Sequence, residues 1–371
     1  MPSAHALEAI VGQDRVRDLL VSAVVEGRVS HAYLFVGAPG SGTLDAAQAL
    51  AQCLVCPNGG DATCEECRRV AHHTHPDVHF IAPQGVGGYL AQQVRELIAD
   101  VQMAPVRANV KVYVLERVEQ LRDTSANALL KTLEEPPEGV VFILCGTTTG
   151  AVLPTIVSRC QVVPFDVVSP DAATAGICAV SGASEEDARI ALAVAGTPAR
   201  AMEFLASPSR QEVRRQAIQA ASTLAQTDAW GVLQEARALT EAVDAPLEDL
   251  KEQLAAAVEQ NADYLSRGAI KQMEDANKRE VTARRRLGMM EVLAAVESLL
   301  RDCLMRREGA GARPVNVDAT DAIERIASTA TTQGILDALA ACSRAAGDLA
   351  HNVSPQLTLE VMLCNIKEAL A

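Results

Sequence analysis

The first 165 residues alternate between two patterns of apolar positions. Apolar residues at Val16, Leu19, Leu20 and Val24 have helical spacing, and the run 32–36 that follows is typical of a short buried strand. Three more strand-like runs and two helical segments continue the alternation, at 78–81, 110–115 and 140–144 and near 91–102 and 123–134. This order predicts a mainly parallel sheet covered by helices.

Beyond Pro164 the strand patterns stop and Ala-rich helical sequence takes over. Breaks fall at Gly196-Thr197-Pro198, at Ser207-Pro208 and in the loop 309–314, where Gly and Pro interrupt the helical pattern. We therefore expect three domains: an α/β nucleotide-binding-like domain at 1–167, a small helical lid domain at 168–208 and an all-α domain at 209–371.

Composition narrows the class of protein. Hydrophobic residues make up 49% of the chain and aromatic residues only 3%, which favours helices over an all-β fold. The start of the chain lacks the basic and apolar regions of a signal peptide, and no apolar stretch is long enough to span a membrane. We expect a cytoplasmic protein, in which clustered cysteines indicate metal binding and scattered ones buried thiols.

The net charge of -14 excludes a surface that is basic throughout. DNA contact is then either local or shared with partners. The best local candidate is Lys278-Arg279 followed by Arg284-Arg285-Arg286, and a solvated helix face explains the same residues.

A glycine-rich loop follows the strand that ends at Val36. Gly37, Gly40 and Gly42 have the spacing of a Walker A loop in the correct strand–loop–helix context. However, Thr43 stands where the phosphate-binding lysine belongs, and Leu44 where a hydroxyl would bind magnesium. The loop is therefore predicted to be a degenerate P-loop without hydrolytic function, which either retains a phosphate on its backbone N–H groups or binds no nucleotide.

The second half of such a site is also altered. An apolar strand ending in Asp-Glu is needed to hold Mg²⁺ and to position water, but the strand 112–115 ends in Glu116-Arg117. Two independent elements of an ATPase site have thus changed together.

Four of the ten cysteines form a cluster at Cys53, Cys56, Cys64 and Cys67. Two Cys-x-x-Cys pairs separated by a turn are typical of a structural zinc site, which predicts a zinc module at about 53–67. Cys53 also fits a buried thiol on the helix after the P-loop. In that case a nearby histidine, at 72, 73 or 75, would complete the site.

Several motifs together resemble the bacterial replicative clamp-loader AAA+ subunits of DNA polymerase III. They span about 8–167 and read Ile10-Val11-Gly12-Gln13, His31-Ala32-Tyr33-Leu34-Phe35, Asn127–Pro137 (NALLKTLEEPP) and Ser158-Arg159-Cys160. The rest of the chain agrees with that family only in length and helical character. The resemblance implies an AAA+ domain, a lid domain and a helical collar domain for oligomerisation.

Within that family, one subunit type combines a degenerate P-loop with a retained Ser-Arg-Cys motif. The resemblance implies that Arg159 acts as an arginine finger on the ATP of a neighbouring subunit; an ordinary surface arginine is the alternative. The family's zinc module more often has one distant cysteine followed by a tight triplet, which places Cys53 in doubt. Its active members also carry a sensor-2 arginine, whereas Arg200 here stands one position late.

The resemblance further implies partners: the ATPase subunits (tau/gamma), a clamp-opening delta subunit, the beta sliding clamp indirectly, and primed DNA through the assembled complex. We expect a subunit with no ATPase activity of its own that helps to load the clamp. The alternatives are an active loader ATPase with an unusual P-loop and a zinc-dependent adaptor unrelated to replication.

Overall fold

The structure is a computed structural model that describes residues 4–84, 88–121, 123–261, 267–350 and 353–370. The chain divides into two compact units. The N-terminal unit comprises residues 1–180 with 197–199, and the C-terminal unit comprises 181–196 with 200–371. The three-domain boundaries at 167 and 208 stay a prediction.

A five-stranded, wholly parallel sheet forms the centre of the N-terminal unit, with the strand order β2-β3-β4-β1-β5. The strands are β1 (Ala32–Val36), β2 (Val78–Ile81), β3 (Lys111–Leu115), β4 (Val140–Gly146) and β5 (Gln161–Pro164). Every residue of β1, β3 and β4 is buried, as expected where helices cover both faces of a parallel sheet. The predicted parallel α/β arrangement is confirmed.

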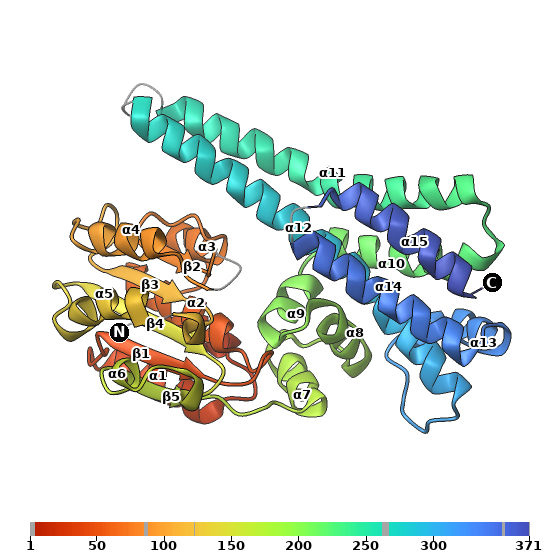
Figure 1. Ribbon diagram of the computed structural model, residues 1–371, viewed down its shortest axis with the longest axis horizontal. Helices are drawn as coiled ribbons and strands as arrows, with labels where there is room; N and C mark the ends of the chain where they lie inside the picture. The colour runs from red at the N-terminus through yellow and green to blue at the C-terminus, as the bar shows by residue number, and fades with distance from the viewer. Residues whose placement is uncertain (1–3, 85–87, 122, 262–266, 351–352, 371) are drawn as a thin grey trace. The chain divides into compact units, whose positions relative to one another are not determined.

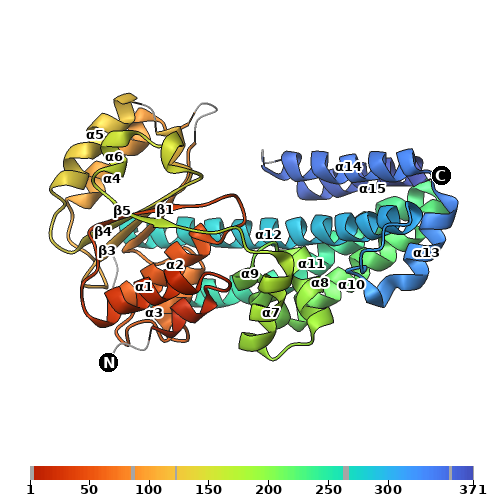
Figure 2. The same ribbon diagram turned by 90° about the horizontal axis from the view of Figure 1, so that it is seen from below.

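Helices cover the sheet on both faces (Figures 1 and 2). One core contains residues of the short helix η1 (His5–Ala9), α1 (Asp14–Val25), α2 (Thr43–Val55) and α3 (Glu65–Ala71). The opposite core contains residues of α4 (Ala91–Val101), α5 (Asp123–Glu134) and α6 (Pro154–Val157). Alternate residues of β1 point to the two sides, with Tyr33 and Phe35 in the first core and Leu34 in the second.

Strand β5 was not predicted from the sequence. It is a four-residue edge strand next to β1, and only Val163 of it is buried. An edge strand with little burial lacks the apolar run that marks a central strand. Its position matters because it directly follows Ser158-Arg159-Cys160.

The regular secondary structure of the described part of the C-terminal unit is helical, as predicted. Helix α7 (Pro170–Ser181) precedes it, and its own helices are α8 (Glu185–Ala195), α9 (Pro198–Leu205), α10 (Pro208–Thr223), α11 (Ala229–Asn261), α12 (Arg267–Arg307), α13 (Thr320–Thr329), α14 (Thr332–Ala350) and α15 (Pro355–Leu370). Helices α9 and α10 begin at the prolines that the sequence indicated, where the missing N–H is tolerated.

Helices α11 and α12 form a long antiparallel hairpin (Figure 1). Helix α14 packs on α12 and α15 packs on α11, and these four helices enclose a core that includes Leu239, Val296 and Ile366. Between 248 and 259, by contrast, no described residue of α11 is buried. The hairpin is therefore packed where it contacts α14 and α15, and solvated in the outer part that contains residues 248–259.

A buried arginine joins three segments of the C-terminal unit. Arg214 of α10 donates hydrogen bonds to Asn316 Oδ1 (2.6 Å) and to both carboxylate oxygens of Asp318, Oδ2 at 2.5 Å and Oδ1 at 2.9 Å. Asn316 in turn donates to Ser298 Oγ (2.9 Å) and Asp302 Oδ2 (2.8 Å) of α12. This network fixes the connection between α12 and α13.

Among the described residues, no helix has the length and apolar character to cross a membrane.

Candidate functional site

The glycine-rich loop lies at the carboxyl end of β1, which stands between β4 and the edge strand β5. The N–H of Gly37 donates to the carbonyl of Gly146 at the end of β4 (3.1 Å), and Gly40 and Gly42 have φ of +85° and +86°. Gln13 holds the loop from outside: its Nε2 donates to the carbonyls of Ser41 (3.1 Å) and Asp166 (2.6 Å). The loop thus has the strand–loop–helix geometry of a phosphate-binding loop.

The side chains of this loop lack phosphate-binding chemistry. Thr43, the first residue of α2, is neutral, and Leu44 packs against the apolar core below the loop. A triphosphate placed here would meet no cation at Thr43 and no Mg²⁺-binding hydroxyl at Leu44.

The end of β3 also differs from that of an ATPase site, because Glu116-Arg117 replaces the Asp-Glu pair. Arg117 has a left-handed backbone conformation (φ +48°), so the chain turns sharply after Glu116. The hydroxyl of buried Tyr89 contacts the carbonyl oxygens of Glu116 (2.6 Å) and Ile81 (2.8 Å). Tyr89 thereby ties together the ends of β2 and β3.

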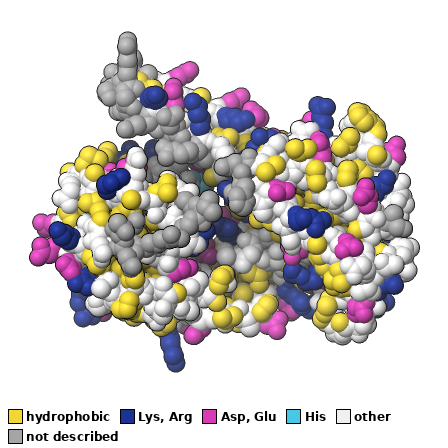
Figure 3. Space-filling view, in the orientation of Figure 1, with side chains coloured by type: hydrophobic (Ala, Val, Ile, Leu, Met, Phe, Trp, Pro, Cys, Tyr) yellow, Lys and Arg dark blue, Asp and Glu magenta, His cyan; other side chains and the backbone are white. Residues whose placement is uncertain are grey.

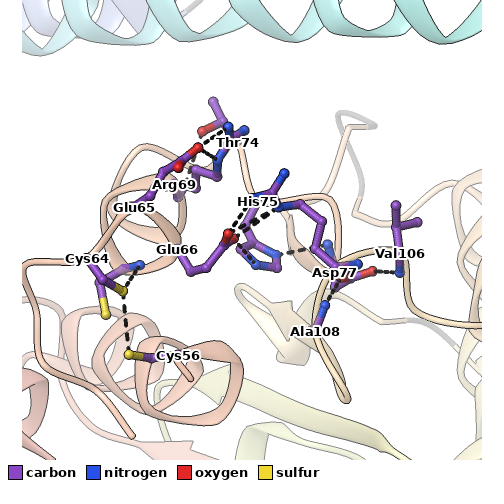
Figure 4. Close-up of polar contacts among 12 residues, drawn as sticks. Cys56, Cys64, Glu65, Glu66, Arg69, Thr74, His75, Asp77, Val106 and Ala108 are labelled. Carbon is purple, nitrogen blue, oxygen red and sulfur yellow. Dashed lines mark hydrogen bonds and ion pairs between the residues drawn. The ribbon is translucent and has the colours of Figure 1, made fainter. Parts of the chain in front are cut away.

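A cluster of possible metal ligands lies between α2 and α3. Cys56, Asp61, Cys64 and Cys67 each offer one ligand atom, and these atoms all lie within 4.8 Å of one another. The Sγ atoms of Cys56 and Cys64 are 3.5 Å apart (Figure 4). Three thiols and a carboxylate fit a tetrahedral zinc site, whose ligand atoms lie roughly 3.5 Å apart.

Hydrogen bonds favour the ionised forms of two of these ligands, Cys56 and Asp61, whereas burial raises the pKa of the Cys64 and Cys67 thiols. Burial alone would raise the pKa of the Cys56 thiol, but backbone hydrogen bonds from Asp61, Gly60 and Asn58 lower it overall. The pKa of Asp61 is lowered by hydrogen bonds, first from Asn58 Nδ2 (2.7 Å) and then from the N–H of Cys64 (2.9 Å). The N–H of Cys67 donates to Cys64 Sγ (3.4 Å) at the start of α3.

Cys53, predicted as a ligand, lies outside this cluster. It is 4% exposed in the core with Leu7 and Leu50, and burial raises the pKa of its thiol to about 12. Its sulfur faces Gly60, where a Cβ would come within 2.4 Å of it. A signal in the sequence could have indicated this: Ala46, Leu50 and Cys53 share the buried face of α2 at helical spacing.

The sequence analysis also missed Asp61, although its position was informative. Two residues separate Asp61 from Cys64, and two separate Cys64 from Cys67. These three residues form a tight triplet that begins with the aspartate, and Cys56 is the ligand farther away in the sequence. The histidines considered as substitutes have other contacts. His73 stacks on Phe80 with ring centroids 3.8 Å apart, and His75 lies beside Glu66.

Polar contacts anchor helix α3, which carries part of this cysteine cluster, to the edge of the sheet (Figure 4). Glu66 of α3 accepts from Arg107 Nη2 (2.6 Å) and lies 2.9 Å from His75 Nε2. Asp77 N–H donates to His75 Nδ1 (3.0 Å), and burial lowers the pKa of this histidine. These contacts indicate a structural role for His75 rather than that of a general base.

Asp77 itself is fully buried and accepts three backbone hydrogen bonds. Its carboxylate oxygens lie 2.6, 2.7 and 2.8 Å from the N–H nitrogens of Val106, Arg107 and Ala108. The carboxylate thus holds the loop before β3 against the start of β2.

Arg159 lies between α6 and β5. Its side chain is 31% exposed, and its Nε donates to Glu134 Oε1 at the end of α5 (2.7 Å) while Nη1 donates to the carbonyl of Thr155 (2.7 Å). Neighbouring Cys160 is partly buried, and burial raises the pKa of its thiol to about 12. The guanidinium therefore reaches the protein surface in a defined orientation.

Two family models match separate parts of the chain. The family described as DNA polymerase III, delta subunit, matches residues 12–169, and DNA polymerase III, delta subunit, C terminal, matches residues 283–368. These two regions of the chain thus match families of DNA polymerase III delta subunits. The first match contains the P-loop, the cysteine cluster and Arg159, so these features belong to the part of the chain that the family shares.

Related proteins agree with this family assignment. The chain is similar to DNA polymerase III subunit delta' of Bacillus subtilis (strain 168), with 38% identity over 163 residues, or 43% of this chain and 49% of the relative. It is also similar to DNA polymerase III subunit tau of Escherichia coli (strain K12), with 40% identity over 155 residues, or 41% of this chain and 24% of tau. The chain thus spans about half of the one relative and a quarter of the other.

A solved structure also matches along the chain: a DNA polymerase III gamma subunit-related protein from Thermotoga maritima. It has 16% identity and a TM-score of 0.38, and the match covers 96% of this chain and all of that one. This likeness is too low to decide the fold, which rests on the strand order and on the loop at the end of β1. The strand order bears out the predicted parallel α/β fold, with a glycine-rich loop between β1 and α2.

Proposed function

We propose that this protein is a non-hydrolysing subunit of the replicative clamp loader. In this role it assembles in the cytoplasm with ATPase subunits of the tau/gamma type and a clamp-opening delta subunit, and it helps to place the beta sliding clamp on primed DNA. The observation that carries the proposal is the loop at the end of β1, where P-loop geometry is combined with Thr43 and Leu44. Similarity to both delta' and tau subunits supports the complex in which it acts.

Arg159 is the residue that we propose acts in catalysis, on ATP bound to a neighbouring subunit. A planar guanidinium matches the oxygens of a transferring phosphoryl group and stabilises its charge. Its contact with Glu134 supports this role, because the carboxylate orients the guanidinium at the surface while leaving it partly exposed.

The metal site in this proposal holds one structural zinc through Cys56, Asp61, Cys64 and Cys67. Zinc would close the connection between α2 and α3 with no open coordination position, which is typical of a structural site. The three-domain organisation, with the helices after 208 as a collar that joins the ring, is part of the same proposal.

The test is reconstitution of the complex with the ATPase and delta subunits of the same organism. The wild-type chain alone should show no ATP turnover above background. In the complex, Arg159→Ala should reduce hydrolysis at the one site it borders by roughly 10³-fold or more, since arginine fingers contribute 10³–10⁵ in rate. Clamp loading should fall with it, while assembly is unchanged.

Two further variants make the test specific. Arg159→Lys should restore little activity, because an ammonium lacks the bidentate fork. Arg28→Ala removes an arginine of 76% exposure that pairs with nearby Glu26, and should leave loading unchanged. Robust ATP turnover by the isolated chain, or normal loading by Arg159→Ala complexes, would overturn the proposal.

A further inference from the structure

A pocket of about 510 Å³ lies on the C-terminal unit, between α9 and the middle of α12. Its lining residues are Arg200, Lys278, Thr282, Ala283, Arg286, Leu287 and Met290. Three of these seven side chains are cationic, and none of the described residues that line the pocket is acidic. This is unusual in a chain with a net charge of -14.

The structure separates the basic segment of α12 into paired and pocket-lining residues. Arg284 donates to Glu280 Oε1 (2.8 Å), and Arg285 donates to Asp244 Oδ2 of α11 (2.6 Å). The Arg284 pair lies within α12, whereas the Arg285 pair joins α12 to α11. Lys278 and Arg286 are exposed instead and line the pocket.

Lys278, Thr282 and Arg286 recur every four residues, so they lie in a row on one face of α12. The row is roughly 12 Å long, given the rise of an α-helix. One strand of B-form DNA carries a phosphate per 3.4 Å of axis, so the row spans about three to four phosphates. The hydroxyl of Thr282 donates to the carbonyl of Lys278 (2.8 Å), which leaves the charged groups as the phosphate-binding groups of this face.

We propose that this pocket binds the phosphodiester backbone of DNA. The two cations of the row, Lys278 and Arg286, attract phosphates of one strand, and Leu287 and Met290 offer an apolar surface for the sugars. No aromatic side chain is among the described lining residues, so bases do not stack there and binding is independent of sequence.

The charge distribution of the rest of the chain makes this contact local. Figure 3 shows Lys and Arg interspersed with Asp and Glu on the face drawn, without a continuous basic surface. Together with the net charge of -14, this limits the proposed DNA contact to the short segment beside the pocket. Arg200, Lys278 and Thr282 also lie outside both ranges that the family models match.

The proposal is independent of the proposed clamp-loader function, because DNA binding by the isolated chain requires neither assembly nor ATP. The experiment measures fluorescence anisotropy of a labelled 30-nucleotide single strand and of the corresponding duplex, titrated with the full chain between 50 and 200 mM salt. The test variant is Lys278→Gln/Arg286→Gln. The matched control, Arg301→Gln/Arg306→Gln, removes the same charge from exposed positions on the same helix.

The test variant should lose on the order of tenfold in affinity at 50 mM salt. Its plot of log affinity against log salt should be less steep by about 1.4 for the single strand and about 1.8 for the duplex, since each phosphate contact contributes about 0.7 or 0.9. The control should stay within about twofold of wild type, and unchanged thermal unfolding should show that the variants are folded.

Three outcomes would overturn the proposal. The first is no binding of either DNA by the wild-type chain at 50 mM salt. The second is an equal loss in the test and control variants. The third is displacement of DNA by micromolar inorganic pyrophosphate or ATP, which would assign the pocket to free polyphosphate; the proposal expects displacement only at millimolar concentrations.

Discussion

One buried carboxylate, Asp77, determines how the edge of the sheet is held together. It accepts three backbone hydrogen bonds with no exposure to solvent. Asp77→Ala would leave these N–H groups without an acceptor, so we expect a loss of about 3 kcal/mol or more in the free energy of unfolding. Asp18→Ala, at an exposed carboxylate, is the control and should change it by less than about 0.5 kcal/mol.

The effect of Asp77 should depend on pH in a defined direction. Burial would raise its pKa, but the N–H groups of Ala108, Val106 and Arg107 lower it overall. A carboxylate whose pKa is lower in the folded state stabilises the fold above its unfolded pKa, about 3.9. Urea unfolding should therefore show a constant difference between wild type and Asp77→Asn above about pH 4, shrinking as the pH falls through the lowered pKa. A difference that grows on acidification would contradict this account.

At the scale of single residues, the sequence was informative about the kind of site but less so about its members. The motif context selected Cys56, Cys64, Cys67 and Arg159. It could not show that the hydrogen bonds around Asp61 turn its carboxylate toward the thiols, because those bonds depend on the backbone path after Cys56. For the same reason the pairing of Arg159 with Glu134, 25 residues away in the chain, was not predictable.

Helix packing offers a matched pair of substitutions on α14. A Cβ at Gly334 would lie 2.1 Å from the carbonyl oxygen of Ala369 on α15, whereas a Cβ at Gly347 would meet no described atom within 4 Å. Gly334→Ala should force α15 away and destabilise the C-terminal unit by about 1–3 kcal/mol. Gly347→Ala should instead stabilise it by up to about 1 kcal/mol, since alanine favours helix.

Chemical denaturation followed by circular dichroism measures both effects. If Gly334→Ala were as stable as Gly347→Ala, the close approach of α14 and α15 would be wrong.

At the scale of elements, apolar runs and helical spacing predicted most of the sheet. Strands β1 and β2 have the predicted bounds, and β3 begins one residue later than expected. Strand β5 was missed because an edge strand of four residues needs no continuous apolar run. The thin outer hairpin of α11 and α12 was not foreseen either, since its charged residues fit any solvated helix.

The division into two units, each with its own core, makes a prediction for the whole molecule. Removing the proposed zinc should affect the N-terminal unit alone. Cys64→Ser should purify with less than one equivalent of zinc by metal analysis, and should lower the unfolding temperature of one thermal transition while a second stays at its wild-type value.

Two variants in the same segment identify the fourth ligand. Asp61→Ala should bind zinc at least tenfold more weakly, whereas Cys53→Ala should retain one equivalent. Full zinc content in Asp61→Ala together with loss in Cys53→Ala would restore the four-cysteine site. The absence of zinc in wild-type protein purified without chelator would rule out both.

The glycines after β1 have a consequence for how such chains evolve. Gly40 and Gly42 adopt backbone angles that L side chains rarely tolerate, so folding alone is enough to retain them. Thr43 and Leu44 are under no such backbone constraint. Selection for a folded loop would thus preserve the two glycines even where the lysine and the hydroxyl are lost. A search for ATPases by glycine spacing alone would then include proteins that no longer hydrolyse nucleotide.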